Sequence, residues 1–138
     1  MKYFSYSEFF KSDAADKHQV NNIPDDMPLS HVLGNINALV LNVLDPLREK
    51  IDRPIIITSG YRNQRVNELV GGSKTSQHLL GQAADIHVQG FTPEQMEIVY
   101  EIAQMYLDFD QLIFYPSKNI IHVSWNGDKN RKESWVKT

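Results

Sequence analysis

Residues 111–125 read QLIFYPSKNIIHVSW, and this stretch decides the fold. Two runs rich in β-branched and aromatic residues, Gln111–Tyr115 and Asn119–Trp125, flank the turn-forming segment Pro116-Ser117-Lys118. This pattern predicts two antiparallel strands joined by a hairpin. Because the helices and strands predicted upstream do not alternate strictly, we expect an α+β fold with a small, mainly antiparallel sheet.

Upstream of the hairpin, the sequence predicts two longer helices and two further strands. Leu29–Lys50 has apolar residues at every third or fourth position, which indicates one long helix with a core-facing stripe. Pro46 is expected to kink or end that helix. Thr92–Leu107 begins with a threonine N-cap, a proline at the first helical position and a glutamine that completes a capping box. Short β-branched or apolar runs predict buried strands at Pro54–Thr58 and Ala83–Val88.

Residues 1–138 are expected to form a single domain. Residues 1–28 are predicted to be an irregular N-terminal arm with a short helix near Ser7–Lys11 and an extended, surface-lying end. One or two helical turns are expected at Arg62–Val70. Residues 126–138 are predicted to be a polar, basic tail of which only a Trp-Val pair packs.

Composition excludes several classes of protein and of site. A net charge of −3 and a pI near 5.9 argue against general nucleic-acid binding, which requires a basic balance. No stretch approaches the roughly 18 apolar residues of a membrane span. The N-terminus lacks the apolar region of a secretory signal, so synthesis in the cytoplasm is expected. The absence of cysteine means that any metal must be bound by nitrogen and oxygen.

Residues 76–85, Ser-Gln-His-Leu-Leu-Gly-Gln-Ala-Ala-Asp, place a histidine and a carboxylate among small and apolar residues. Asp85 falls in a predicted buried strand, where an unpaired carboxylate is so costly that it requires a partner or a metal. His122 lies on the polar face of a hairpin strand together with Ser124. His78, Asp85 and His122 form a three-ligand set for one zinc ion with its fourth position open, which is typical of catalytic zinc.

Other interpretations of these residues remain open. His122 could be a core histidine bonded to a carbonyl. His87 shares a strand face with Asp85 and could be a rival third ligand, a partner of a ligand or a surface residue. Arg62 follows a strand end, where it could bind a carboxylate or an oxyanion, or form a surface ion pair.

The stretches 59–62 (Ser-Gly-Tyr-Arg), 76–85 and 122–124 (His-Val-Ser), in this order and spacing, closely resemble the zinc D-Ala-D-Ala carboxypeptidase family. That family includes bacterial D,D-carboxypeptidases, vancomycin-resistance D,D-dipeptidases and phage L-alanyl-D-glutamate endolysins, and the hedgehog signalling domain shares its fold. The resemblance covers about residues 29–125. The opening stretch 4–12, followed by Asn-Asn-Ile-Pro, is similar to compact phage- or prophage-type members.

The resemblance implies a hedgehog/D,D-peptidase-like fold and a zinc metallopeptidase that hydrolyses a bond next to a D-amino acid in peptidoglycan stem peptides. It implies zinc ligation by His78, Asp85 and His122. It further implies contact of Arg62 with the scissile carbonyl or terminal carboxylate, and a hydrogen bond from Ser76 to the substrate. We expect a monomer that is made in the cytoplasm and reaches the cell wall after lysis or by a separate export route.

The sequence departs from the family pattern at the general base. Many members carry a glutamate three residues before the last histidine ligand, where this chain has Asn119, and an amide cannot accept the proton. Asp108 and Asp110, which flank Phe109 one strand earlier, are alternative bases that the sequence slightly favours. The mismatch also leaves open a catalytically weak or silent zinc-containing cell-wall-binding module, or a phage structural component.

Overall fold

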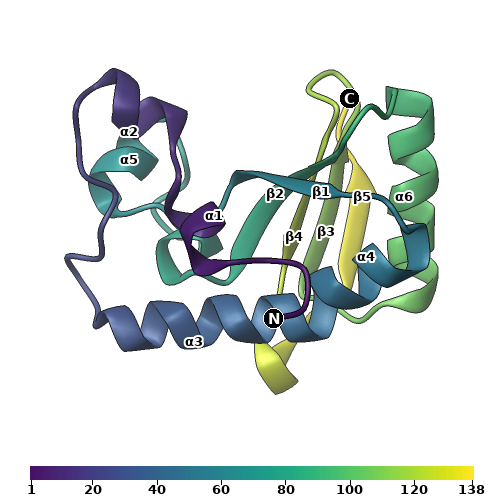
Figure 1. Ribbon diagram of the computed structural model, residues 1–138, viewed down its shortest axis with the longest axis horizontal. Coiled ribbons are helices and arrows are strands. Elements are labelled where there is room, and N and C mark those ends of the chain that lie inside the picture. Colours follow the sequence, from purple (N-terminus) through teal and green to yellow (C-terminus); the bar gives the residue numbers. More distant parts are fainter.

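The computed structural model describes all 138 residues, which form one five-stranded sheet with helices packed against it (Figure 1). The spatial strand order is β1-β2-β4-β3-β5. The pair β3–β5 is parallel, and the other pairs are antiparallel. The predicted α+β class with a mainly antiparallel sheet is therefore confirmed. The strands are β1 (Ile55–Ser59), β2 (Ala83–Val88), β3 (Gln111–Tyr115), β4 (Ile120–Ser124) and β5 (Glu133–Val136).

The two longer helices are present where the sequence predicted them. The first is α3 (Leu29–Leu39), a π-helical turn η1 (Val40–Leu44) and α4 (Asp45–Ile51), which follow one another without a break. Pro46 does not end the helix: it lies in the first turn of α4, directly after a π turn that accommodates the missing backbone N–H. The second, α6 (Pro93–Tyr106), begins with the predicted capping box. None of the helices combines the length and the apolar character that a membrane crossing requires.

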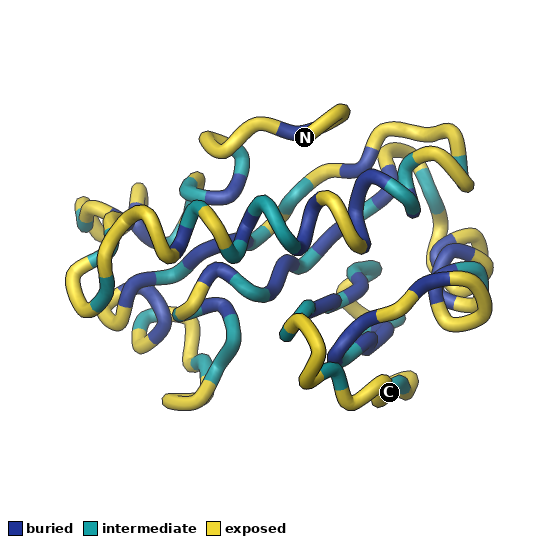
Figure 2. Tube along the Cα trace, turned by 90° about the horizontal axis from the view of Figure 1, so that it is seen from below, coloured by how far each residue is buried: buried dark blue, intermediate teal, exposed yellow.

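The hydrophobic core lies between these helices and one face of the sheet. Alternate strand residues such as Ile86 and Ile121 belong to one buried cluster with Ile36 of α3 and Met96 of α6. Figure 2 shows buried positions recurring between exposed ones along the long helix. Each such side chain stabilises the fold by about 1.5–3 kcal/mol. The strand residues between them, such as Asp85 and His122, point to the opposite face of the sheet.

The N-terminal arm, residues 1–28, is packed into this core. It contains the expected short helix, α1 (Tyr6–Phe10), and a second one that the sequence did not predict, α2 (Asp13–Lys17). Phe9 has no exposed surface and belongs to the core cluster. Asn22 is buried, and its Nδ2 donates to a backbone carbonyl of the segment that follows β1, at 2.8 Å. The N-terminal arm therefore packs against the segment that follows β1 and helps to hold it in place.

The structure corrects the predicted polar tail, residues 126–138. It contains a 3-10 turn, η3 (Gly127–Lys129), and the edge strand β5. The backbone N–H of Lys137 continues the pairing by donating to Phe114 O of β3 at 2.8 Å. Figure 1 accordingly shows the C-terminus beside the turn that joins β3 to β4. No local sequence pattern predicts β5, because it is short and pairs in parallel with β3, to which no tight turn joins it.

Candidate metal centre

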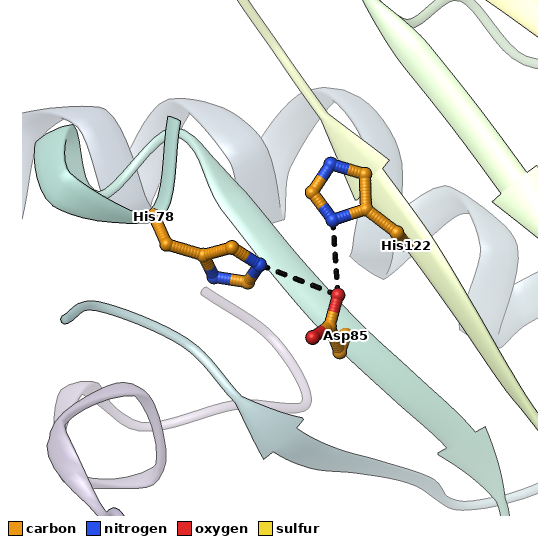
Figure 3. Close-up of side chains that lie close together, drawn as sticks. All are labelled: His78, Asp85 and His122. Carbon is orange, nitrogen blue, oxygen red and sulfur yellow. Dashed lines mark hydrogen bonds and ion pairs between the residues drawn. The ribbon is translucent and has the colours of Figure 1, made fainter. Parts of the chain in front are cut away.

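Three side chains from separate elements converge on the open face of the sheet (Figure 3). Asp85 on β2 and His122 on β4 are direct partners in the strand register, so both project from the same face. His78 comes from η2 (Gln77–Leu80), the 3-10 turn before β2. Asp85 Oδ1 lies 2.9 Å from His122 Nδ1 and 3.3 Å from His78 Nε2. One donor atom from each residue lies within 4.8 Å of the others, so a single ion can contact all three.

The hydrogen bonding of His78 decides which ring nitrogen is free. Its Nδ1 lies 2.7 Å from Gly60 O, and because a carbonyl only accepts, Nδ1 must carry the proton. Burial lowers the pKa of His78 and outweighs the opposing effect of Asp85, which favours the neutral ring. Nε2 then presents a lone pair to the carboxylate oxygen. Two acceptors facing each other repel without a cation between them, so this donor set fits a metal ion.

Asp85 is suited to act as an ionised ligand. Burial is the largest influence and acts to raise its pKa, but the contacts with the imidazoles, that with His122 first, outweigh burial and hold the pKa far below its usual range. Its second oxygen, Oδ2, accepts a hydrogen bond from Arg62 Nη2 at 3.2 Å. Arg62 therefore orients the carboxylate and leaves Oδ1 directed at the two histidines. Such an orienting partner commonly changes metal affinity about tenfold or more.

Arg62 is itself held by two further contacts. Its Nε donates to Ser59 Oγ at 3.0 Å, and its Nη1 donates to Asn67 Oδ1, on α5 (Gln64–Leu69), at 3.4 Å. A guanidinium has further N–H groups beyond these, and Arg62 lines the cleft. The predicted contact of Arg62 with substrate stays a prediction. The structure adds a role that the sequence did not reveal, the positioning of Asp85.

Ser76 and Gly81 define the two ends of η2. Ser76 Oγ accepts from the backbone N–H of His78 at 3.2 Å, and Ser76 lines the cleft, where its predicted contact with substrate stays untested. Gly81 has a φ of 75°, and a Cβ at this position would lie 2.9 Å from Val32 O. Both features require glycine, because a side chain disfavours positive φ and has no room here. The chain thereby turns from His78 directly into β2.

The structure does not bring His87 into the cluster. Its Nδ1 lies 2.9 Å from Asn119 O, and His87 is not among the converging donors, so the geometry does not support a rival third ligand. Asn119 itself adopts a left-handed φ of 54°, and its Nδ2 donates to Phe91 O at 2.8 Å. Its Oδ1 is buried, and the residue does not line the cleft. The side chain at this position therefore points away from the metal centre.

The two alternative bases are also placed outside the cleft. Asp110 is fully buried; its Oδ1 accepts from Arg131 Nε at 2.8 Å, and its Oδ2 accepts from Gln77 Nε2 at 2.9 Å. The side chain of Asp108 is 60% exposed and lies 3.9 Å from Lys132 Nζ. Neither carboxylate lines the cleft, so the structure does not support either one as the general base.

His78, Asp85 and His122 line a cleft of about 500 Å³. Ile113 and Tyr115 of β3 contribute to its floor, and residues between 70 and 77 form a wall. Burial, followed by the charge of Asp85, raises the pKa of Tyr115, so its hydroxyl is a proton donor at neutral pH. Asp85 is the only carboxylate in the lining. The Arg and Lys residues of the lining are Arg62, Lys118, Arg131 and Lys137.

A family model described as Peptidase M15 matches residues 2–124, which include the three converging side chains, Arg62 and Ser76. The chain belongs to the peptidase M15 family. Peptidase M15 proteins are zinc-dependent metallopeptidases that act on peptidoglycan-related substrates, so the predicted family and general chemistry are confirmed at this level. A search of curated proteins found no match. The matched span ends before β5, so that strand lies outside the part of the chain that the M15 family model describes.

Four residues at or beside the cleft have roles that the sequence analysis did not predict. Gly60 orients His78 through its carbonyl, and Asn67 supports Arg62. A glycine at a strand end was a usable signal for Gly60, because such a residue often marks a close backbone approach. Arg131 and Lys137 reach the cleft only through the parallel pairing of β5, for which no local pattern exists.

Proposed function

We propose that this chain is a zinc metallopeptidase that hydrolyses a peptide bond next to a D-amino acid in peptidoglycan stem peptides. The observation that carries the proposal is the convergence of His78 Nε2, Asp85 Oδ1 and His122 Nδ1 on the wall of an open, cationic cleft. Membership of the peptidase M15 family supports the reaction class. An excess of cations in the cleft suits a peptide that carries carboxylates.

A zinc ion held by His78, Asp85 and His122 would supply Lewis acidity toward the scissile carbonyl and lower the pKa of a water molecule. The chain's own side chains would position the peptide. Arg62 has N–H groups left for a carbonyl oxygen or a terminal carboxylate, where charge develops during hydrolysis. The hydroxyl groups of Ser76 and Tyr115 are further donors along the cleft. The same cleft could bind a terminal carboxylate or an internal peptide segment, so carboxypeptidase and endopeptidase action are both compatible with it.

The lining contains no carboxylate besides Asp85, and the side chain of Asn119 points elsewhere. A positioned general base contributes about 10²–10⁴-fold to rate, so turnover is expected to be slow compared with an enzyme that has one. This observation favours a second candidate, a catalytically weak or silent zinc-containing module that binds cell wall or serves a structural role.

Defined stem peptides separate these candidates. Zinc-loaded protein is incubated with peptides of known sequence, with and without a chelator, and the products are identified by mass spectrometry. We expect chelator-sensitive cleavage at one bond adjacent to a D-residue, restored by zinc and lost in His122→Ala. Retention on cell walls without products would support a binding module. A fall in melting temperature on chelation, with neither products nor retention, would support a structural role for the metal.

A further inference from the structure

We propose that Lys118 and Lys137 form a carboxylate-binding subsite at the hairpin-turn end of the cleft, which holds an acidic group of the substrate away from the scissile bond. The identity of the substrate rests on the proposed peptidase function. The existence of the subsite does not, since it can be measured by binding alone.

The two lysines are far apart in the sequence but lie at the same end of the sheet. Lys118 lies in the turn between β3 and β4, and Lys137 directly follows β5. Because β5 runs parallel to β3, its C-terminal end arrives beside that turn, as the position of the C-terminus in Figure 1 shows. The bond from Lys137 N–H to Phe114 O, at 2.8 Å, fixes this placement. Both lysines line the same cleft as His122.

The two lysines differ from the other cations of the cleft because neither forms an ion pair. Arg62 is paired with Asp85 at 3.2 Å, and Arg131 with the buried Asp110 at 2.8 Å. The ammonium of Lys118 lies over the ring of Tyr115, whose centre is 5.5 Å from Nζ. Two uncompensated ammonium groups that line one cleft make its potential more positive, and a bound carboxylate would compensate this charge.

The charge of the cleft is opposite to that of the whole chain. The protein carries a net charge of −3, yet Asp85 is the only carboxylate that lines the cleft, and it is engaged with Arg62 and the two histidines. A cationic depression on an acidic protein concentrates anionic ligands at that place. The chemistry recognised is an alkyl carboxylate of an acidic peptide, which in a stem peptide is either a side carboxylate or the terminal one.

One of the two subsite residues lies beyond the part of the chain that the family model matches. Lys137 lies outside residues 2–124, and only the edge pairing of β5 brings it to the cleft. Lys118 lies within the matched span, on an exposed turn. The edge strand β5 thus brings the positive charge of Lys137 to the cleft without contacting the candidate metal ligands.

Three forms of one stem peptide test the proposal: one with both carboxylates free, one with the side carboxylate amidated and one with the terminal carboxylate amidated. Lys118→Gln and Lys137→Gln are compared with wild type and with Lys129→Gln, an exposed lysine outside the cleft. We expect each subsite variant to raise KM, and Kd measured by titration of chelator-treated protein, about three- to tenfold for the free peptide. The kcat should stay unchanged, and one amidation should abolish the difference, which identifies the carboxylate. Lys129→Gln should behave as wild type.

Equal Kd for wild type and both variants, an equal loss with all three peptides, or no measurable binding by wild type would overturn the subsite. Charge-dependent binding without cleavage would support the subsite and contradict the peptidase. Cleavage without charge preference would support the peptidase and contradict the subsite.

Discussion

Replacing Gly60 by alanine should strongly destabilise the protein, because the N-terminal arm leaves no room for a side chain there. A Cβ at this position would lie 2.6 Å from Phe9 O and 2.7 Å from Phe9 Cα, whereas ordinary contacts begin at 3.4 Å. Both are backbone atoms, so rotating a side chain cannot relieve the clash. The arm would have to move away by about 0.8 Å, the difference between 3.4 and 2.6 Å.

The magnitude follows from what this movement disturbs. The Tyr61 N–H donates to Phe9 O at 2.7 Å, and the Phe9 ring is fully buried. Weakening one backbone hydrogen bond costs about 1 kcal/mol, and forcing extra atoms into a packed core costs about 1–3 kcal/mol. We therefore expect the free energy of unfolding to fall by about 2–4 kcal/mol and the melting temperature by roughly 10 °C. Zinc affinity should fall as well, because the carbonyl of Gly60 orients His78.

Urea unfolding of the metal-free protein measures this effect. Gly34→Ala is the matched control: Gly34 lies exposed in α3, and no atom would be within 4 Å of a new Cβ. The control should stabilise the protein by up to about 1 kcal/mol, because alanine favours the helix. A change below about 0.5 kcal/mol for Gly60→Ala would show that the arm does not pack tightly against the segment after β1.

Other substitutions test the buried ion pair, the turn and the metal. Asp110→Asn should lower the free energy of unfolding at pH 7 by about 1–2 kcal/mol, a modest value because half-exposed Arg131 is screened by solvent. The hydrogen bond from Arg131 holds the folded-state pKa of Asp110 below its ordinary 3.8, so urea titrations should show this difference undiminished above about pH 4 and shrinking as pH falls through the lower folded value. Asn119→Glu should not accelerate turnover, since this side chain bonds Phe91 O outside the cleft; a faster variant in steady-state assays would contradict its placement. His122→Ala should reduce bound zinc, by elemental analysis, from about one ion per chain toward zero, and unchanged zinc would remove it from the ligand set.

The elements that could be predicted from sequence are those whose signals are local. The capping box of α6 and the hairpin of β3 and β4 follow from residues within a few positions of one another. The candidate ligand set could be predicted for a different reason. A carboxylate at Asp85 inside a buried strand demanded a partner, and strand alternation placed His122 on a polar face. The register, with Asp85 opposite His122, then unites them.

What could not be predicted depends on contacts between distant segments. The parallel pairing of β5 with β3 is decided by which strand edge is free after the hairpin has formed, and no periodicity in the last residues reports it. The orientation of Asn119 depends on a positive φ and on Phe91, 28 positions away. Asp110 is excluded as a base by its ion pair with Arg131, a contact that depends on the position of the loop before β5.

In the proposed site, the residues for zinc binding and those for recognition of substrate charge lie on different elements, and β5 contributes only to the second. The candidate ligand atoms come from η2, β2 and β4. The strands β2 and β4 are inner strands paired on both sides, so they form the most constrained part of the sheet. The two unpaired lysines lie in a turn and directly after the edge strand β5, where both side chains are exposed and a substitution changes charge but no core contact. Zinc binding and recognition of substrate charge should therefore vary independently. Changes in β5 should alter which acidic peptides bind while the metal content of the protein stays the same.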